Sequence, residues 1–534
     1  MTTSDYVVLG GGSAGCVVAS RLSEDPNSTV TLLEAGPWDS NPWIHLPVGF
    51  AKLYVTKKFD WEYHTEPEPE LDGRRVYWPR GRVMGGSGSV NGLVWLRGSP
   101  RDYDRWAQAG ARGWSYEDCL PAFKRMETVA NNDSPLRGHD GPMQVGEVRD
   151  PTPGCRAFVE ACQALGFPRN PDFNGEWYEG VAPNQLNVHK GRRWSPAVAY
   201  IHPAKKRPNL RIETECLGLS LLFEGVRCTG VRIRRKDGTV QEFLARREVV
   251  LSCGAIESPK MLMLSGIGPA AQLAQHGIAV RHDAPDVGQN LQDHFQARIS
   301  FRTRPADTLN ETMASLLGQA RMAMKWALTR RGHMTVGASE ASLFARVLPG
   351  AEEPDVQYQF INFTMDTRPG QIAAELHKHP GFAFNFCQAR PESRGEVTLR
   401  SADPVEKPAM VANYMTHPTD ARIMLAAARL GRRIAATSPF ADLVEEEINP
   451  GRSAQSDDEL MHFIRQTGGT VYHPCGTNRM GSDARSVVDP ELRVRGVEGL
   501  RVADASVFPT MPSSNIQPAC IMTGERCAEL IRAA

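Results

Sequence analysis

A glycine-rich turn between a short strand and a helix opens the chain and constrains its fold more than any other feature. Tyr6 to Leu9 is an apolar run of strand type, and residues 17–22 continue as a helix. The glycines between them have the GxGxxG spacing of a dinucleotide-binding turn. Such glycines allow a tight turn, close approach of a pyrophosphate and packing of the helix on the strand. The free N–H groups of the helix then point at the anion.

The next strand ends on an acidic residue at the spacing that this turn requires. Val30 to Leu33 form the strand and Glu34 follows, about 20 residues beyond the glycines. A carboxylate there accepts hydrogen bonds from a ribose diol and repels a 2′-phosphate. A tight turn without any ligand is the alternative, but it leaves the acid unexplained. The predicted dinucleotide site comprises Gly10, Gly12, Ser13, Ala14, Gly15 and Glu34.

Charge and cysteine usage indicate the kind of ligand and the compartment, and leave peripheral membrane attachment open. The 61 basic and 61 acidic residues balance, which gives no electrostatic reason for binding nucleic acid or an anionic membrane. The eleven cysteines include no CxxC pair and no zinc-binding pattern, as is typical of thiols kept reduced in a cytosol. No secretory signal precedes the first strand, and no apolar run reaches the roughly 18 residues that span a bilayer. We expect a soluble cytoplasmic protein with a small-molecule ligand and no metal ion.

A second glycine-rich segment runs from Arg80 to Gly92. Its glycine density implies a backbone held close to something flat or charged. A flexible linker is the alternative, but linkers are polar, whereas Val90 and residues 93–96 are apolar.

The rest of the chain indicates two structural units. Residues 248–251 form a strand that leads to another turn and helix, where Ser258 as N-cap and Pro259 as the first helical residue predict a helix over residues 260–264. Between 296 and 454, strand-like segments such as 356–360 and 395–399 accompany helices such as 421–434. We predict an α/β fold in which a Rossmann-like parallel-sheet domain (1–150, 190–295 and 455–534) carries an inserted α+β substrate domain on an antiparallel sheet (151–189 and 296–454).

Four segments in this order resemble the glucose-methanol-choline (GMC) family of flavin oxidoreductases, over essentially the whole chain. The first glycine motif with Glu34 resembles the family's FAD fingerprint, residues 80–98 its first signature, 254–268 its second, and 500–515 its terminal active-site region. The chain resembles bacterial members that act on choline, sorbose or aliphatic alcohols more than it resembles the fungal sugar oxidases. The resemblance implies an FAD-dependent dehydrogenase or oxidase that converts a small non-sugar alcohol to an aldehyde or ketone. It implies hydride transfer to flavin N5, with oxygen or a quinone-type acceptor reoxidising the flavin.

The resemblance also implies where FAD lies. Some relatives carry a histidine, covalently linked to the flavin, just before the asparagine of the first signature. Val90 occupies that position here, which predicts noncovalent FAD. The residues implied at the flavin are Gly85, Ser87, Asn91, Gly92 and Val94, and those implied at the pyrophosphate are Asp504 and Ala505.

Two residues match the family's catalytic positions. His473 stands where the family places its catalytic histidine, and Asn515 stands where members have histidine or asparagine. A histidine suits a base because its reference pKa of about 6.5 leaves it neutral at working pH. An asparagine amide can donate to the alcohol oxygen without competing for the proton.

Four further residues have a functional and a structural interpretation. Asn290 and Asp293 beside His294 indicate a hydrogen-bonded hinge between the domains. Glu340, in the inserted domain, could recognise a cation or could simply be solvated. Trp61 could wall the cavity entrance or pack, and Cys475 is interpreted as a packing residue.

Three rival classes remain open at this point. A nicotinamide enzyme would share the first glycine motif but would not need the second glycine segment. A non-redox lyase on the same scaffold would hold a flavin that its substrate does not bleach. A pure binding protein would hold FAD without turnover.

Overall fold

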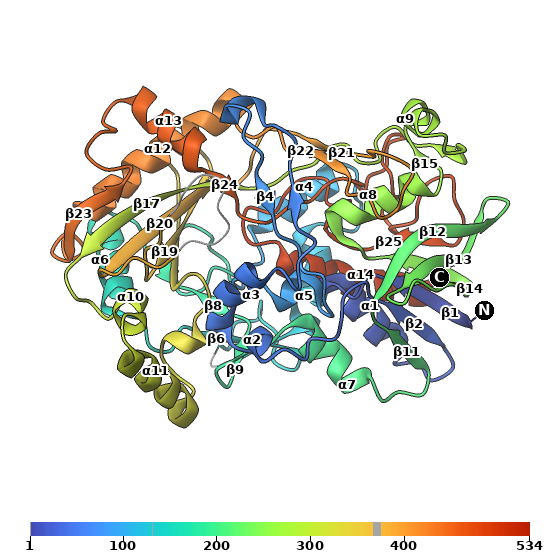
Figure 1. The fold of residues 1–534 in the computed structure, drawn as a ribbon, viewed down its shortest axis with the longest axis horizontal. Helices are drawn as coiled ribbons and strands as arrows, with labels where there is room; N and C mark the ends of the chain where they lie inside the picture. Colours follow the sequence, from blue (N-terminus) through green and yellow to red (C-terminus); the bar gives the residue numbers. More distant parts are fainter. Residues whose placement is uncertain (1, 131, 367–374) are drawn as a thin grey trace.

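A mostly parallel sheet lies on the side of the molecule that holds both chain ends (Figure 1). The structure is a computed structural model that describes residues 2–130, 132–366 and 375–534. Strands β11, β2, β1, β14 and β25 pair in parallel, and β12 and β13 extend the sheet in antiparallel fashion. The bounds are β1 (Thr2–Leu9), β2 (Val30–Leu33), β11 (Leu210–Glu213), β12 (Cys216–Glu224), β13 (Arg227–Arg235), β14 (Val240–Leu251) and β25 (Leu500–Val502).

Two helices pack against each other beside this sheet. Helix α1 (Ser13–Leu22) follows β1 directly, and α14 (Gln517–Ala533) closes the chain. A Cβ on Gly524 of α14 would lie 2.8 Å from the carbonyl oxygen of Ala14, so the two backbones approach as closely as glycine permits. Residues 6–9 of β1 are buried throughout, as expected for a central parallel strand covered on both faces.

The second sheet is antiparallel throughout and lies on the opposite side of the molecule (Figure 1). Helices α6 (Pro153–Ala164) and α12 (Pro418–Ala435) pack on one face of it. Along β17, the odd-numbered residues from Phe295 to Phe301 join the core with these helices, while the even-numbered residues face the other way. The strands are β7 (Gly180–Pro183), β17 (Phe295–Thr303), β18 (Ala341–Ala345), β19 (Val356–Ile361), β20 (Gly381–Gln388), β23 (Val444–Asn449) and β24 (Gly469–Thr470).

The predicted α/β fold class, with one parallel and one antiparallel sheet, is confirmed. The proposed division between the two domains stays a prediction. Within the segment 455–534, helix α13 (Asp457–Thr467) packs on α12, and β24 pairs with β17 of the second sheet.

Helix α8 begins earlier than the sequence predicted. It spans Gly254–Leu264, so Pro259 lies inside the helix and Ser258 is not its cap. The carboxylate of Asp504 caps the helix instead, accepting from the Gly254 N–H (2.9 Å) and the Ser258 hydroxyl (2.6 Å). A helical proline leaves the carbonyl four residues earlier without a partner. Here that carbonyl, on Ala255, accepts a hydrogen bond from the Thr477 hydroxyl (2.7 Å).

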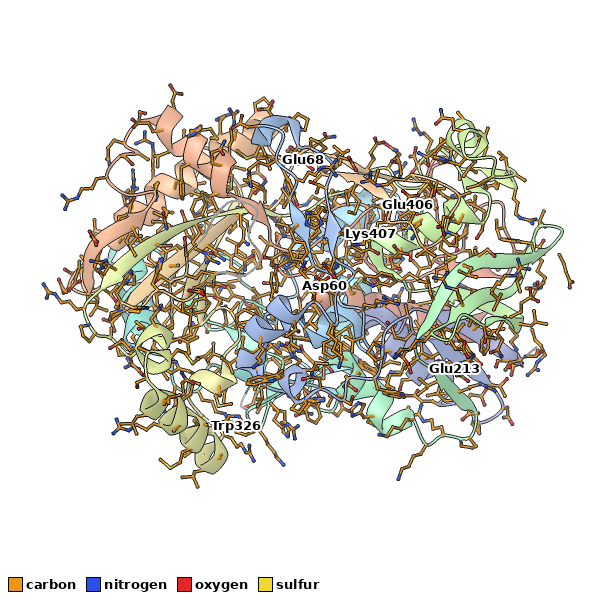
Figure 2. The ribbon with its side chains drawn as sticks, in the orientation of Figure 1. Asp60, Glu68, Glu213, Trp326, Glu406 and Lys407 are labelled. Carbon is orange, nitrogen blue, oxygen red and sulfur yellow. The ribbon has the colours of Figure 1, made fainter. Side chains whose placement is uncertain are left out.

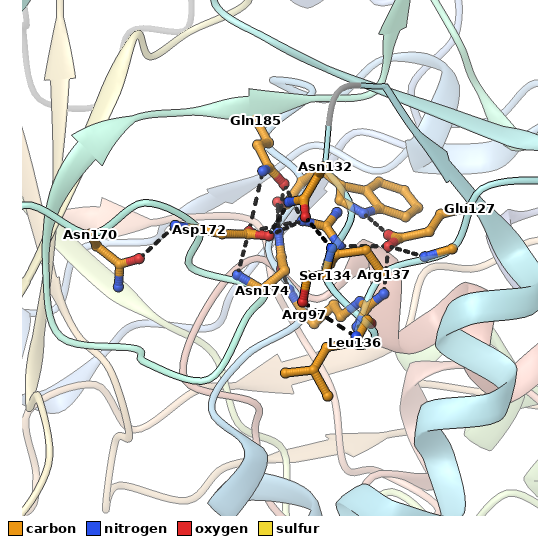
Figure 3. A network of polar contacts seen from close by, with 12 residues as sticks. Arg97, Glu127, Asn132, Ser134, Leu136, Arg137, Asn170, Asp172, Asn174 and Gln185 are labelled. Carbon is orange, nitrogen blue, oxygen red and sulfur yellow. Dashed lines mark hydrogen bonds and ion pairs between the residues drawn. The ribbon is translucent and has the colours of Figure 1, made fainter.

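A buried ion network fixes the chain that follows the second glycine segment (Figure 3). Glu127 accepts hydrogen bonds from Arg97 (2.5 Å) and Arg137 (2.7 Å), and Arg137 also pairs with Asp172 (2.6 Å). Burial raises the pKa of the Glu127 carboxyl, but the two arginines more than offset this and hold it below its usual value. Removing one partner of such a network would leave a buried charge uncompensated.

None of the helices in the described part of the chain is long and apolar enough to cross a membrane. All eleven cysteines are free, and nine of them are buried.

Candidate active site

A cavity of about 590 Å³ is lined by residues of both units. It extends from the turn at Gly10 to His473 and Asn515. Asp60, which also lines it, lies between the two units in Figure 2. A cavity of this size suits a small-molecule ligand.

The first glycine motif shapes one end of this cavity. Gly12, Ser13 and Ala14 line it, and no side chain caps the N-terminus of α1. Gly10 lines the cavity too, but its φ of +103° shows why the turn needs glycine there. Gly15 faces the protein instead: an added Cβ would lie 1.9 Å from the Gly10 carbonyl oxygen. The helix therefore offers free N–H groups to an anion.

Glu34 lines the same end of the cavity and stabilises the glycine turn through hydrogen bonds. Its two carboxylate oxygens accept from the N–H groups of Gly11 (2.8 Å) and Gly36 (2.7 Å). Burial raises the pKa of this carboxyl to about 7, and these backbone hydrogen bonds oppose the shift. Because each carboxylate oxygen has two acceptor sites, both can still accept from a ribose hydroxyl.

The second glycine segment packs directly on the first. Residues 86–89 form a 3-10 turn, and a Cβ on Gly86 would lie 2.8 Å from the Cα atom of Gly12. The flexible-linker alternative is therefore excluded. Gly85, with a φ of +88°, does not line the cavity. The predicted residues of this segment that line the cavity are Ser87, Asn91, Gly92 and Val94.

The start of helix α14 completes this part of the wall. The Asn91 amide donates to Gln517 Oε1 (2.6 Å), while Gln517 Nε2 is buried without a partner. Asp504 and Ala505 also line the cavity. An uncapped helix N-terminus, an adjacent acid and an unpartnered amide donor fit a dinucleotide cofactor with a flat ring system.

A chain of hydrogen bonds fixes the tautomer of His473 at the other end. His294 Nε2 lies 2.9 Å from the Ala389 carbonyl oxygen, so this nitrogen carries the proton of His294. The unprotonated Nδ1 of His294 then accepts from Nδ1 of His473, 2.9 Å away. His473 is left with a lone pair on Nε2, which lies 3.2 Å from the Asn515 amide nitrogen.

The surroundings keep both imidazoles neutral. Burial, with contributions from His294 and Arg80, lowers the pKa of His473 well below 6.5. Burial also lowers the pKa of His294 to about 4. A neutral imidazole with a free Nε2 lone pair can act as a general base.

Asn515 is oriented from the second sheet. Gln357 Nε2 donates to its carbonyl oxygen (3.4 Å), so its NH₂ group faces His473. This group donates to Nε2 of His473 in the structure, and it can donate to an alcohol oxygen instead when the hydroxyl takes its place at Nε2.

Asp293 holds the backbone of the histidine. Its carboxylate accepts from the His473 N–H (2.7 Å) and from the Tyr414 hydroxyl. Burial raises the pKa of this carboxyl to about 6. Arg80 donates to the Tyr472 carbonyl oxygen (2.6 Å), so both the carbonyl and the N–H of the peptide group between Tyr472 and His473 are hydrogen-bonded.

The other candidates have different surroundings from those expected. His294 touches His473 directly, rather than serving only as a hinge. Glu340 is buried away from the cavity and accepts from the Thr152 N–H (3.0 Å) and hydroxyl (2.8 Å), so it is neither solvated nor poised for a cation. Trp61 lines the cavity and stacks on Tyr63. Cys475 is fully buried, which raises the pKa of its thiol and agrees with a packing role.

Comparison with known proteins gives consistent matches. Two family models described as GMC oxidoreductase match residues 4–296 and 391–524. The oxygen-dependent choline dehydrogenases of Brucella anthropi and Sinorhizobium fredii are each 43% identical over 99% of this chain and 95% of their own length. The crystal structure of pyridoxine 4-oxidase from Mesorbium loti has a TM-score of 0.89 and 31% identity, covering 99% of both chains. Formate oxidase of Aspergillus oryzae RIB40 has a TM-score of 0.92 and 28% identity, covering 100% of this chain and 98% of its own.

Proposed function

Because this chain belongs to the GMC oxidoreductase family, we propose that its cavity oxidises a small non-sugar alcohol to an aldehyde or ketone, with His473 as the base. The chain is an FAD-dependent oxidoreductase that acts on CH–OH donors. FAD, when bound, supplies the acceptor for the hydride, its N5 atom. The observation that carries the proposal is the neutral His473, whose Nε2 lone pair faces the Asn515 amide.

We propose that the glycine-lined end of the cavity holds the cofactor. The N–H groups at the start of α1 would bind the pyrophosphate, and Glu34 would accept from the ribose diol. Ser87, Asn91, Gly92 and Val94 would face the ring system, with Asp504 and Ala505 near the pyrophosphate. Gly15 and Gly85 would act indirectly, by letting the backbone segments pack.

His473 and Asn515 would have different roles at the alcohol group of the substrate. Nε2 of His473 would take the hydroxyl proton, while the Asn515 amide would donate to the same oxygen and favour its negative charge. Proton removal makes the carbinol a better hydride donor. The lyase alternative finds no support among the related proteins.

The physiological acceptor and the location belong to this proposal as well. The names of the choline dehydrogenase and oxidase relatives favour oxygen, with a quinone-type acceptor as the alternative. Peroxide release, measured against dye reduction, distinguishes these acceptors. The eleven free cysteines support a reducing compartment, and we propose the cytoplasm.

An anaerobic titration tests the proposed function. The purified protein is expected to be yellow, and a small alcohol added without oxygen is expected to bleach its visible flavin absorbance while an aldehyde or ketone accumulates. A protein that stays colourless after incubation with FAD would contradict the flavin assignment. A yellow protein that no alcohol in a broad panel bleaches would contradict the proposal and favour a lyase or a binding protein.

The cofactor is expected to be dissociable. Val90, which lines the cavity, has no nucleophilic group to bond with a flavin. Acid precipitation of the holoenzyme should therefore release essentially all the flavin into the supernatant, where its absorbance is read. Yellow colour retained in the washed pellet would contradict this prediction.

A further inference from the structure

A row of polar side chains crosses the cavity wall formed by the second sheet. Arg298 on β17 pairs in register with Asn385 on β20, which pairs with Gln359 on β19. All three residues line the cavity. Arg298 Nε donates to Asn385 Oδ1 (2.7 Å), whereas its Nη1 is buried without a partner.

No carboxylate compensates the charge of this guanidinium. Every Asp and Glu of the chain lies within the described residues, and none is at ion-pair distance from Arg298. Burial lowers the pKa of Arg298, and only the hydroxyls of Tyr472 and Tyr54 act in the opposite direction. An arginine stays charged even so, and a buried charge without a counter-ion costs free energy that an anionic ligand would offset.

The four carboxylates that line the cavity are already engaged. Glu34 and Asp504 bind backbone N–H groups at the glycine-lined end. Asp60 accepts from the Arg80 N–H (2.8 Å) and the Tyr77 hydroxyl, and Glu257 accepts from Tyr63 (2.5 Å) and pairs with Lys260 (3.3 Å). These carboxylate groups therefore already have hydrogen-bond donors, whereas the Nη1 atom of Arg298 has no acceptor among the described residues.

The register also places this charge relative to the candidate base. The adjacent row of the same sheet face pairs Gln296 with Cys387 and Cys387 with Gln357, and Gln357 contacts Asn515. Two residues along a strand span about 7 Å. The guanidinium row therefore lies a few carbon atoms beyond the place where a carbinol would meet His473 and Asn515.

We propose that the substrate is an alcohol carrying a carboxylate, and that Arg298 binds the carboxylate while the hydroxyl faces His473. This inference rests on the proposed function and names its substrate class. A planar guanidinium with free N–H groups matches carboxylate geometry. The same charge repels a quaternary ammonium, so choline is expected to be a poor substrate of this chain.

Kinetics on three alcohols of similar length test the proposal with the holoenzyme. The expected order of kcat/KM is 6-hydroxyhexanoate first, then 1-hexanol, then choline. Arg298→Met is expected to lower kcat/KM for 6-hydroxyhexanoate by about 10- to 100-fold, the range for a hydrogen bond to a charged group, and to change it for 1-hexanol less than about threefold. Arg302→Met is the matched control, since Arg302 lies on the same strand but is half exposed and pairs with Glu446.

A binding measurement keeps the test independent of turnover. Hexanoate lacks the hydroxyl, so its calorimetric affinity reports the carboxylate site alone. Arg298→Met should weaken its binding about 10- to 100-fold, with Arg298→Lys in between. Preference for choline, or equal loss on all three alcohols in Arg298→Met, would overturn the inference while leaving alcohol oxidation intact. Failure of every alcohol to reduce the flavin would instead overturn the proposed function.

Discussion

Replacing His473 by alanine is expected to slow the reduction of bound FAD by alcohol about 100- to 10,000-fold, the range for losing a positioned general base. The cofactor should stay bound, because the glycine-lined end of the cavity does not depend on this side chain. Stopped-flow absorbance, recorded anaerobically at saturating alcohol, measures the rate constant directly. Reduction at the wild-type rate would remove His473 from the mechanism.

His462→Ala is the matched control, since His462 is exposed on α13. It should leave both flavin content and reduction rate unchanged.

The pH dependence of the wild type gives a second readout. Because burial lowers the pKa of His473, the base is already neutral above its ordinary pKa of about 6.5, so the rate should be flat at higher pH and fall only below it. A decline beginning above neutrality would contradict the assignment.

Gly15→Ala is expected to yield a protein without FAD. The added Cβ would lie 1.9 Å from the Gly10 carbonyl oxygen, so the turn must open or the helix must shift away from the strand. Overpacking of this kind costs roughly 1–3 kcal/mol or more of folding free energy. The flavin-to-protein absorbance ratio measures cofactor content, and denaturant unfolding of the apoprotein measures stability.

Gly12→Ala separates the two roles of the glycines. Its Cβ would lie 3.7 Å from the nearest atom, the Ser252 carbonyl oxygen, and its φ of −78° suits alanine. The apoprotein should therefore unfold like the wild type, while FAD affinity falls about tenfold or more because the methyl group keeps the pyrophosphate from the backbone. Normal FAD content in both variants would contradict the assigned site.

The local parts of the fold could be predicted from the sequence, and the parts that depend on distant segments could not. Strand β1, helix α1 and strand β2 follow from short apolar runs and glycine spacing. The start of α8 was predicted wrongly because its cap, Asp504, is 250 positions from the N–H that it binds. The hydroxyl group of Thr477, which binds the Ala255 carbonyl left without a partner by Pro259, is also distant in the sequence. Local signals around Ser258 and Pro259 contained none of this.

The candidate site shows the same division. His473 and Asn515 came from resemblance to a family, and the structure places them 3.2 Å apart. Gln357 and Arg298 were missed because each is an ordinary polar residue on a strand. Only the register of the antiparallel sheet brings Gln357 to Asn515 and Arg298 to the cavity. Glu340 attracted attention as an isolated acid, but its partner Thr152 is 188 positions away.

The carbonyl of Ala389 has a consequence for anyone who grafts substrate-binding regions between relatives. It comes directly after β20, yet it decides, through His294, which nitrogen of His473 is free. A chimaera that imports a new antiparallel sheet must therefore keep this backbone oxygen in place where the imported segment joins the rest of the chain. If the oxygen is displaced, the chimaera can bind the intended substrate, but His473 will carry its proton on the nitrogen that should act as the base.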